Sequence, residues 1–284
     1  MTAMTSPSSP VGTPAVPTDL HTGGLGGHPR GLTTLFLAEM WERFSFYGMR
    51  AILMLFMVLA VTEGGLGYDT RKAAGIYGTY TMSGYLLCIL GGFLADNFIG
   101  ARRSVLIGGI IIALGHFTMA LNSELTFFTG LALVAAGTGL LKPNISTMVG
   151  SLYRPEDERR DAGFSIFYMG INLGAFLAPL ICGYLAQSAS WKATLVGWGL
   201  DPRSSWHWGF AAAGVGMTLG LIVYVRQRSR LAHVGNAPAP ETGGTRPWGK
   251  LGLVLLGSLA LITAMWFSDT YQWIVYLLFA LQIA

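Results

Sequence analysis

The sequence predicts an all-α integral membrane protein, and three observations carry this prediction: an apolar composition, several long apolar segments and few charged residues. Hydrophobic residues make up 52% of the 284 residues, charged residues make up 11%, and the mean hydropathy is +0.51. Soluble domains usually carry about 25% charged residues. A segment of about 18 apolar residues is long enough to cross the hydrocarbon layer of a bilayer, which is ~30 Å thick. A soluble core of this size does not need so many segments of that length.

Six apolar segments are predicted to be transmembrane helices that form one bundle over residues 28–226. They are Leu32–Val61, Ala74–Phe98, Ser104–Leu121, Leu125–Gly150, Gly163–Ala186 and Trp208–Val225. Residues 1–27 are rich in Ser, Thr, Pro and Gly and lack the basic start and apolar stretch of a signal peptide, so we expect a disordered cytosolic tail.

The remainder of the chain is predicted to be a linker followed by one or two further hydrophobic helices. Residues 227–247 contain Pro and Gly throughout and are interpreted as a cytosolic linker. Residues 248–284 hold two apolar segments, Leu251–Phe267 and Gln272–Ala284, which we interpret as an additional transmembrane hairpin, truncated at its second member.

Basic residues are distributed unequally between the two sides of this topology. With the N-terminus in the cytosol, the cytosolic segments hold 11 of the 18 Lys and Arg residues and the outer loops hold 4. The positive-inside rule therefore favours a multi-pass protein of the inner membrane with a cytosolic N-terminus.

Four ionisable residues lie inside the first predicted span. Glu39, Glu42, Arg43 and Arg50 fall within an arc of about 100° on a helix of 3.6 residues per turn, with Phe46 and Tyr47 beside them. Each charge in a transmembrane helix costs about 2.5–3.5 kcal/mol on insertion scales unless it faces protein or water. We therefore expect this charged face to point into the bundle.

The third basic residue inside the spans is Lys142, in the fourth span. At a rise of about 1.5 Å per residue, Lys142 and Arg43 lie at similar depth, so the sequence predicts that they meet across one cavity. Two carboxylates and three cations leave one positive charge uncompensated, and such a site favours an additional anion. The alternative is that these charges only hold helices together.

Two other polar patterns suggest binding or gating. Tyr168 and Asn172 lie one turn apart on the fifth span and are predicted to bind a solute, although a helix–helix hydrogen bond by Asn172 is an alternative. Asp96 lies at the end of the second span and Arg102 and Arg103 follow it, and we interpret them as a gating loop or, alternatively, as a static turn.

Enzymatic, metal and nucleic-acid functions are not predicted. The sequence contains no Walker P-loop, H-E-x-x-H or G-x-S-x-G motif, and no Cys/His spacing that indicates zinc. We expect no cofactor, and the pI of about 9.1 reflects loop charges and not a nucleic-acid surface. Cys88 and Cys182 lie in apolar segments and are expected to be buried thiols, although a disulfide remains an alternative.

Three motifs in this order are similar to a known family. They are Glu39-x-x-Glu42-Arg43-Phe44-x-Phe46-Tyr47-Gly48, the glycine- and arginine-containing loop from Gly91 to Arg103, and the segment from Phe167 to Gly174. The chain from His28 onward resembles the proton-coupled oligopeptide transporters, a branch of the major facilitator superfamily.

The resemblance implies the N-terminal six-helix bundle of the major facilitator fold and a role in proton-driven uptake of di- and tripeptides. It implies a proton-coupling set of Glu39, Glu42, Arg43 and Lys142. It further implies a peptide pocket, whose expected residues are Tyr47, Arg50, Tyr85, Lys142 and Asn172, with Phe46 and Tyr168 beside them.

The sequence departs from the family pattern in two respects. Phe46 stands where the family usually has tyrosine, which removes one hydroxyl from the expected pocket. The second six-helix bundle of the family is not found in the 284 residues, so we expect a missing half-transporter to be a partner of this chain. The alternatives are a carrier of another anionic solute, such as nitrate or an amino-acid conjugate, and a membrane scaffold that transports nothing.

Overall fold

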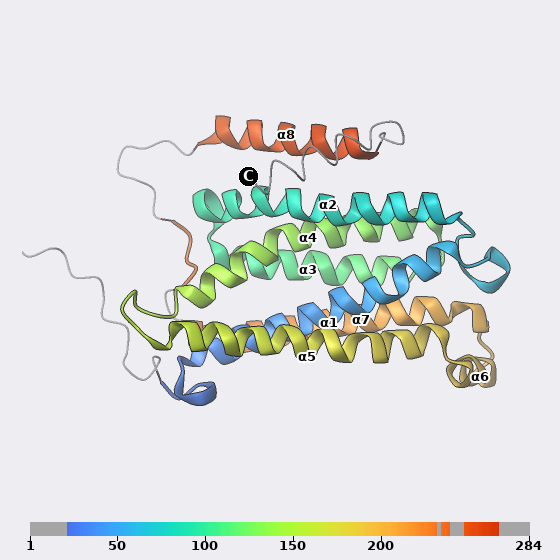
Figure 1. The fold of residues 1–284 in the computed structure, drawn as a ribbon, viewed down its shortest axis with the longest axis horizontal. Helices are drawn as coiled ribbons and strands as arrows, with labels where there is room; N and C mark the ends of the chain where they lie inside the picture. The colour runs from blue at the N-terminus through green and yellow to red at the C-terminus, as the bar shows by residue number, and fades with distance from the viewer. Residues whose placement is uncertain (1–21, 232–233, 239–246, 267–284) are drawn as a thin grey trace, which may run out of the picture.

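The computed structural model describes residues 22–231, 234–238 and 247–266, and within them the secondary structure is helical with no strand. Six long helices run side by side in alternating directions (Figure 1). They are α1 (Arg30–Val58), α2 (Thr70–Leu94), α3 (Ala101–Met119), α4 (Glu124–Gly150), α5 (Arg159–Gln187) and α7 (Ser205–Arg226). Each corresponds to one of the six predicted spans, which confirms an all-α architecture.

The helices extend beyond the apolar segments at several ends. The fifth helix begins at Arg159 and not at the predicted Gly163. Once a helix has formed, each further residue adds a backbone hydrogen bond, so the helix extends beyond the apolar segment into polar residues. The second helix ends in a π-helical turn, η4 (Ala95–Ile99). A short helix, α6 (Ala189–Gly197), was not predicted, since its apolar part is too short to span a membrane.

The six helices form two groups of three. In the first group α1 packs against α5 and α7, and in the second α4 packs between α2 and α3. The contact of α3 with α7 joins the two groups. An additional helix, α8 (Trp248–Trp266), packs against α2 (Figure 1). It corresponds to the first member of the predicted hairpin, whereas the second member, Gln272–Ala284, lies outside the described residues.

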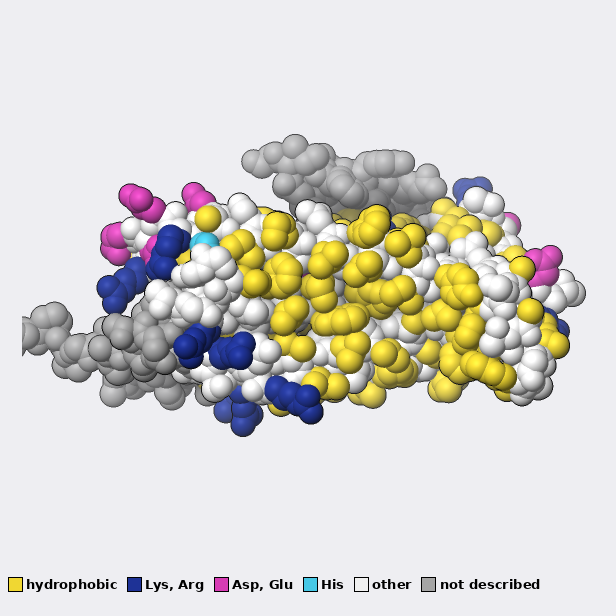
Figure 2. Space-filling model, turned by 90° about the horizontal axis from the view of Figure 1, so that it is seen from below, with side chains coloured by type: hydrophobic (Ala, Val, Ile, Leu, Met, Phe, Trp, Pro, Cys, Tyr) yellow, Lys and Arg dark blue, Asp and Glu magenta, His cyan; other side chains and the backbone are white. Residues whose placement is uncertain are grey.

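Apolar side chains cover the outside of the bundle and charges collect at its ends. Figure 2 shows a broad hydrophobic band over the middle of one face, with most of its Lys and Arg side chains at one end. Within the described residues four helical segments are long and apolar enough to cross a membrane: Thr70–Ile99, Glu124–Gly150, Arg159–Gln187 and Pro202–Arg226. The first helix is equally long but carries Glu39, Glu42, Arg43 and Arg50.

The contact between α1 and α5 depends on small residues. A Cβ atom at Gly174 would overlap the carbonyl oxygen of Met40, and one at Gly170 would lie 3.0 Å from the carbonyl oxygen of Phe36. These two glycines therefore allow the two backbones to approach closely, as expected for small residues four positions apart.

We predict that Gly174→Ala destabilises the purified chain by roughly 1–3 kcal/mol, because the added methyl overlaps the backbone of α1. The matched control is Gly183→Ala on the same helix, where the nearest heavy atom to a new Cβ is 3.9 Å away. Thermal unfolding in detergent is the measurement. Equal melting temperatures for the two variants would contradict the close approach of α1 and α5.

Residues 22–29 pack against the loop between α4 and α5. A hydrogen bond of 2.9 Å joins His28 Nδ1 to the Tyr153 hydroxyl, and Arg159 Nη1 donates to the Gly27 carbonyl oxygen at 3.3 Å. Arg159 also hydrogen-bonds Asp157 and lowers the pKa of that carboxyl to about 2. The tail that was predicted to be disordered up to residue 27 is thus ordered from residue 22, and residues 1–21 lie outside the described part.

The chain after α7 returns to the turn between α2 and α3. After η6 (Arg228–Leu231), the backbone N–H of Arg102 donates to the Gly235 carbonyl oxygen at 2.8 Å. Leu231 and Val234 are buried, and the rings of Phe98 and Trp248 lie 4.8 Å apart. The predicted linker, residues 227–247, therefore packs in part on this turn.

We predict that the Gly235 carbonyl slows hydrogen exchange at the Arg102 amide, because an amide in the first turn of a helix has no acceptor within that helix. Gly235→Ala should increase the exchange rate of the Arg102 amide about five- to tenfold. The φ of Gly235 is +72° and a Cβ atom there would lie 2.9 Å from the Arg102 nitrogen, so the substitution should weaken this hydrogen bond. The control is Gly199→Ala, which has a similar φ of +75° and no atom within 4 Å. Unchanged exchange at Arg102 in Gly235→Ala would refute this contact.

Candidate functional site

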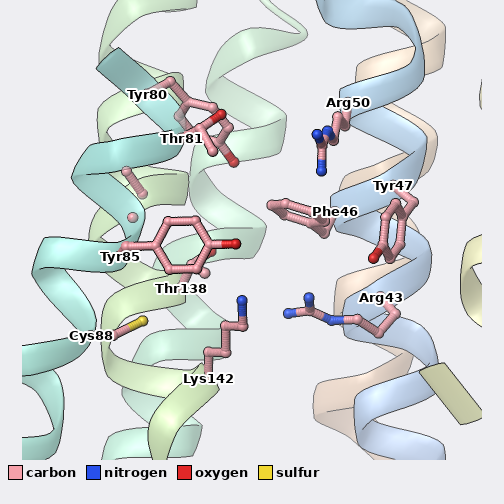
Figure 3. A pocket seen from close by; sticks show the side chains of 12 residues that line it. Arg43, Phe46, Tyr47, Arg50, Tyr80, Thr81, Tyr85, Cys88, Thr138 and Lys142 are labelled. Atoms are coloured by element: carbon pink, nitrogen blue, oxygen red, sulfur yellow. The ribbon is translucent and has the colours of Figure 1, made fainter. Parts of the chain in front are cut away.

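A pocket of about 90 Å³ lies between the two helix groups, with α1 on one side and α2 and α4 on the other (Figure 3). The first helix contributes Arg43, Phe46, Tyr47 and Arg50. The opposite wall is formed by residues of α2 and α4, namely Tyr80, Thr81, Gly84, Tyr85, Cys88, Ala135, Thr138 and Lys142.

Arg43 is held by both glutamates of α1. Its Nε lies 3.1 Å from Glu39 Oε1 and also hydrogen-bonds Glu42 Oε2. All three residues are at most 4% exposed. Because both carboxylates bind the Nε atom, the outer end of the guanidinium extends into the pocket, as Figure 3 shows.

Lys142 approaches the same pocket from α4. Its Nζ lies 4.8 Å from the centre of the Tyr85 ring, and Arg43 Cζ lies 5.0 Å from the centre of the Phe46 ring. The two cationic side chains point toward each other (Figure 3). Both line this pocket, so the cavity that was predicted from their matching depth is present.

Arg50 lies further along α1 and is positioned by aromatic rings. Its Nε donates to the Tyr77 hydroxyl, and its Cζ lies 5.5 Å from the Tyr77 ring centre and 5.9 Å from that of Phe46. The phenyl ring of Phe46 therefore lies between the two arginines of α1 and faces both by cation–π contact. A hydroxyl is not needed for this contact.

Sequence reasoning predicted Tyr85 and Lys142 on the opposite wall but missed Thr81, Cys88 and Thr138 there, and it missed Tyr77, which contacts Arg50. Tyr77, Thr81, Tyr85 and Cys88 follow one another at spacings of three and four, which places them on one face of α2. This spacing was the signal available in the sequence. Thr138 of α4 had no such signal, because only the packing of α4 beside α2 brings it to the pocket.

Tyr168 and Asn172 lie on α5 and do not line this pocket. Tyr168 is 57% exposed and Asn172 is also exposed. Within the described residues neither side chain forms a hydrogen bond, so the alternative of a helix–helix bond by Asn172 is not realised there. Their contact with a solute stays a prediction.

The charges are unequally distributed around the pocket. Among the residues that the structure describes, Arg43, Arg50 and Lys142 line it and no acidic residue does, since Glu39 and Glu42 lie behind Arg43. Arg43 Nη2 and Thr138 Oγ1 are buried and find no hydrogen-bond partner within the described residues. Buried polar atoms of this kind require a partner, and the surplus of positive charge favours an anionic one such as a carboxylate.

The predicted gating residues lie at one end of the bundle, away from the pocket. Asp96 is exposed in the turn η4, and Arg103 is exposed in the first turn of α3. The carbonyl oxygen of Arg102 accepts a 3.0 Å hydrogen bond from the Tyr224 hydroxyl of α7. Their role in gating stays a prediction. Both cysteines are free thiols. Cys182 is buried as expected, whereas Cys88 is half-buried and lines the pocket.

Comparison with known proteins agrees with this geometry. Residues 102–241 match the POT family. The chain is 48% identical over 201 residues to the peptide transporter YePEPT of Yersinia enterocolitica, a match that covers 70% of this chain and 36% of that protein. It is 43% identical over 217 residues to a di-/tripeptide transporter of Lactococcus lactis, which covers 75% and 41% respectively.

Over residues 102–241 the chain belongs to the POT family. A crystal structure of a POT family transporter in complex with a thioalcohol-conjugated peptide superposes with a TM-score of 0.74 at 35% identity, over 94% of this chain and 53% of that one. The bundle therefore has the major facilitator fold and resides in a membrane. The chain spans less than half of the length of the two curated relatives described above. These relatives are transporters and not enzymes.

We predict that the pocket is reached by water. In a background without Cys88 and Cys182, a cysteine in place of Tyr85 should react at least about tenfold faster with a charged methanethiosulfonate reagent than one in place of Ile222 on the outer face of α7. Both positions are exposed, by 54% and 41%, but only the first lines the pocket. An unreactive cysteine at position 85 would show that these charges do not face a wet chamber.

Proposed function

We propose that this chain is part of a symporter that couples proton entry to the uptake of di- and tripeptides by alternating access. The observation that carries the proposal is the pocket, where three cations face a common space and two carboxylates, Glu39 and Glu42, are buried behind one of them. The names of its relatives, a peptide transporter and a di-/tripeptide transporter, support peptides as substrates.

The cations suit the C-terminal carboxylate of a short peptide. Arg50 and Lys142 approach the pocket from opposite walls, and the terminal nitrogens of Arg43 extend into the same space. Charge-assisted hydrogen bonds to a carboxylate are the strongest that these side chains make. Tyr47 and Tyr85 line the wall and supply ring faces and hydroxyls to the peptide, and Asn172 and Tyr168 of α5 would contact it on the open side.

The carboxylates of α1 suit a proton site. Glu39 Oε2 and Glu42 Oε1 are buried and have no hydrogen-bond donor within the described residues. A proton on either glutamate would neutralise a charge that holds Arg43, so Arg43 would turn from the carboxyl toward the pocket. Protonation and binding of an anionic peptide group would then favour each other, because protonation of a glutamate increases the surplus of positive charge around the pocket and the bound anion offsets it.

Alternating access requires a second half against which this bundle moves. In a transporter built from two six-helix bundles the substrate binds between them, near the middle of the membrane. We propose that the complete transporter supplies that half, that Asp96, Arg102 and Arg103 act in the gating contact, and that the N-terminus lies in the cytosol at the inner membrane.

The test is dipeptide uptake into proteoliposomes that contain the complete transporter of which this chain is part, driven by a proton gradient. Lys142→Ala and Glu42→Gln should each lower the uptake rate by at least about tenfold. Lys142→Ala removes one of the cations that face the pocket, and Glu42→Gln removes a charged partner of the buried Arg43. The controls are Lys72→Ala and Glu63→Gln, which change exposed residues of the same types and should leave uptake unchanged. Normal uptake by both pocket variants would refute the proposal.

Competition separates peptides from other anionic solutes that the same cations would bind. An excess of unlabelled dipeptide should abolish uptake of a labelled dipeptide, whereas nitrate at the same concentration should not. Uptake of nitrate that unlabelled dipeptide leaves unaffected would instead favour a carrier of another anion.

A further inference from the structure

The short helix α6 lies across one end of the bundle. It connects α5 to α7, and in Figure 1 it is seen end-on while the long helices are seen from the side. Its first turn is capped by Ser188, whose hydroxyl accepts from the Trp191 backbone N–H at 3.4 Å. A nine-residue helix is too short to be stable in water by itself, so it depends on a surface that covers one of its faces.

The bundle covers little of α6. Leu195 is its only buried residue, whereas Val196 is 58% exposed, Trp198 is 60% exposed and Leu200, just beyond the helix, is 43% exposed. Large apolar side chains in adjacent positions therefore lie uncovered at this end.

Three tryptophans form one cluster at this place. The ring of Trp191 lies 5.5 Å from that of Trp198 and 5.6 Å from that of Trp208 at the start of α7, and the last two rings are 6.5 Å apart. All three pairs meet edge to face, a favourable arrangement for aromatic rings. The cluster joins α6 to α7 and keeps Trp198 turned outward.

The cluster lies between apolar and charged surface. Along α7 from Trp208, the exposed residues Val215, Leu219 and Ile222 continue the apolar outer face. In the other direction lies an exposed ion pair, in which Arg203 Nη2 is 2.7 Å from Asp201 Oδ2. Indole rings concentrate at this boundary in membrane proteins, because the ring is apolar and its N–H is polar.

We propose that α6 and the cluster of Trp191, Trp198 and Trp208 bind the phospholipids of the adjacent leaflet at the level of their glycerol esters. In this position α6 is an interfacial helix whose apolar side chains enter the membrane surface while the Asp201–Arg203 pair stays in water. The contact continues the lipid-facing surface of α7 and sets the depth of the loop that joins α5 to α7.

The test uses the chain reconstituted in phosphatidylcholine vesicles and compares it with Trp198→Phe, so that the difference in fluorescence reports Trp198 alone. Bromine atoms near the upper end of the acyl chains should quench this difference by about twofold or more, while aqueous iodide should leave it nearly unchanged. The control is Trp206→Phe, because Trp206 is buried in the bundle and its emission should resist both quenchers.

Two outcomes would overturn the proposal. Quenching of the Trp198 emission by iodide without quenching by brominated lipid would show that the cluster projects into water. Quenching by neither reagent would show that another protein surface, such as a second copy of this chain, covers Trp198. Neither outcome would bear on peptide transport, which depends on the pocket between α1, α2 and α4.

Discussion

The structure depends above all on the pairing of Arg43 with Glu39 and Glu42 inside the first helix. Three charges placed in hydrocarbon would each cost several kcal/mol, but here they are nearly fully buried against one another. The pairing is within one helix, so it forms as soon as α1 forms. Because these charges must be kept out of the lipid, this face of α1 points into the protein. The direction of this face in turn determines which other faces of α1 pack against α5 and α7.

The division of the bundle into two groups of helices then creates the pocket. Close packing holds α1 against α5 and α7, and it holds α4 between α2 and α3. The glycines of α3 and α4 permit this second contact, since a Cβ atom at Gly137 would lie 2.5 Å from the Gly108 carbonyl oxygen. Because the two groups join chiefly through α3 and α7, the space between α1 and the pair α2–α4 stays open to polar side chains.

The match to the POT family model and the α1 and α2 residues of the site lie in different parts of the chain. The matched family region covers residues 102–241, whereas Glu39, Glu42, Arg43, Arg50 and the aromatic wall of α2 lie before it. The argument for an anion-binding pocket next to a proton site therefore rests on this chain's own residues. The match to the peptide-bound POT structure covers 94% of the chain and so includes these residues.

The sequence by itself determined the membrane class, the six long helices and the inward direction of the charges on α1, because apolar length and helical periodicity are local properties. It also placed Arg43 and Lys142 at one depth, since a helix has a constant rise per residue. Only the tertiary structure decided which helices are neighbours. It showed that Thr138 and Tyr77 contribute to the site, whereas Tyr168 and Asn172 lie outside its pocket. It also brought the three tryptophans at α6 into one cluster. These depend on contacts between residues far apart in the chain, which only the packing of whole helices establishes.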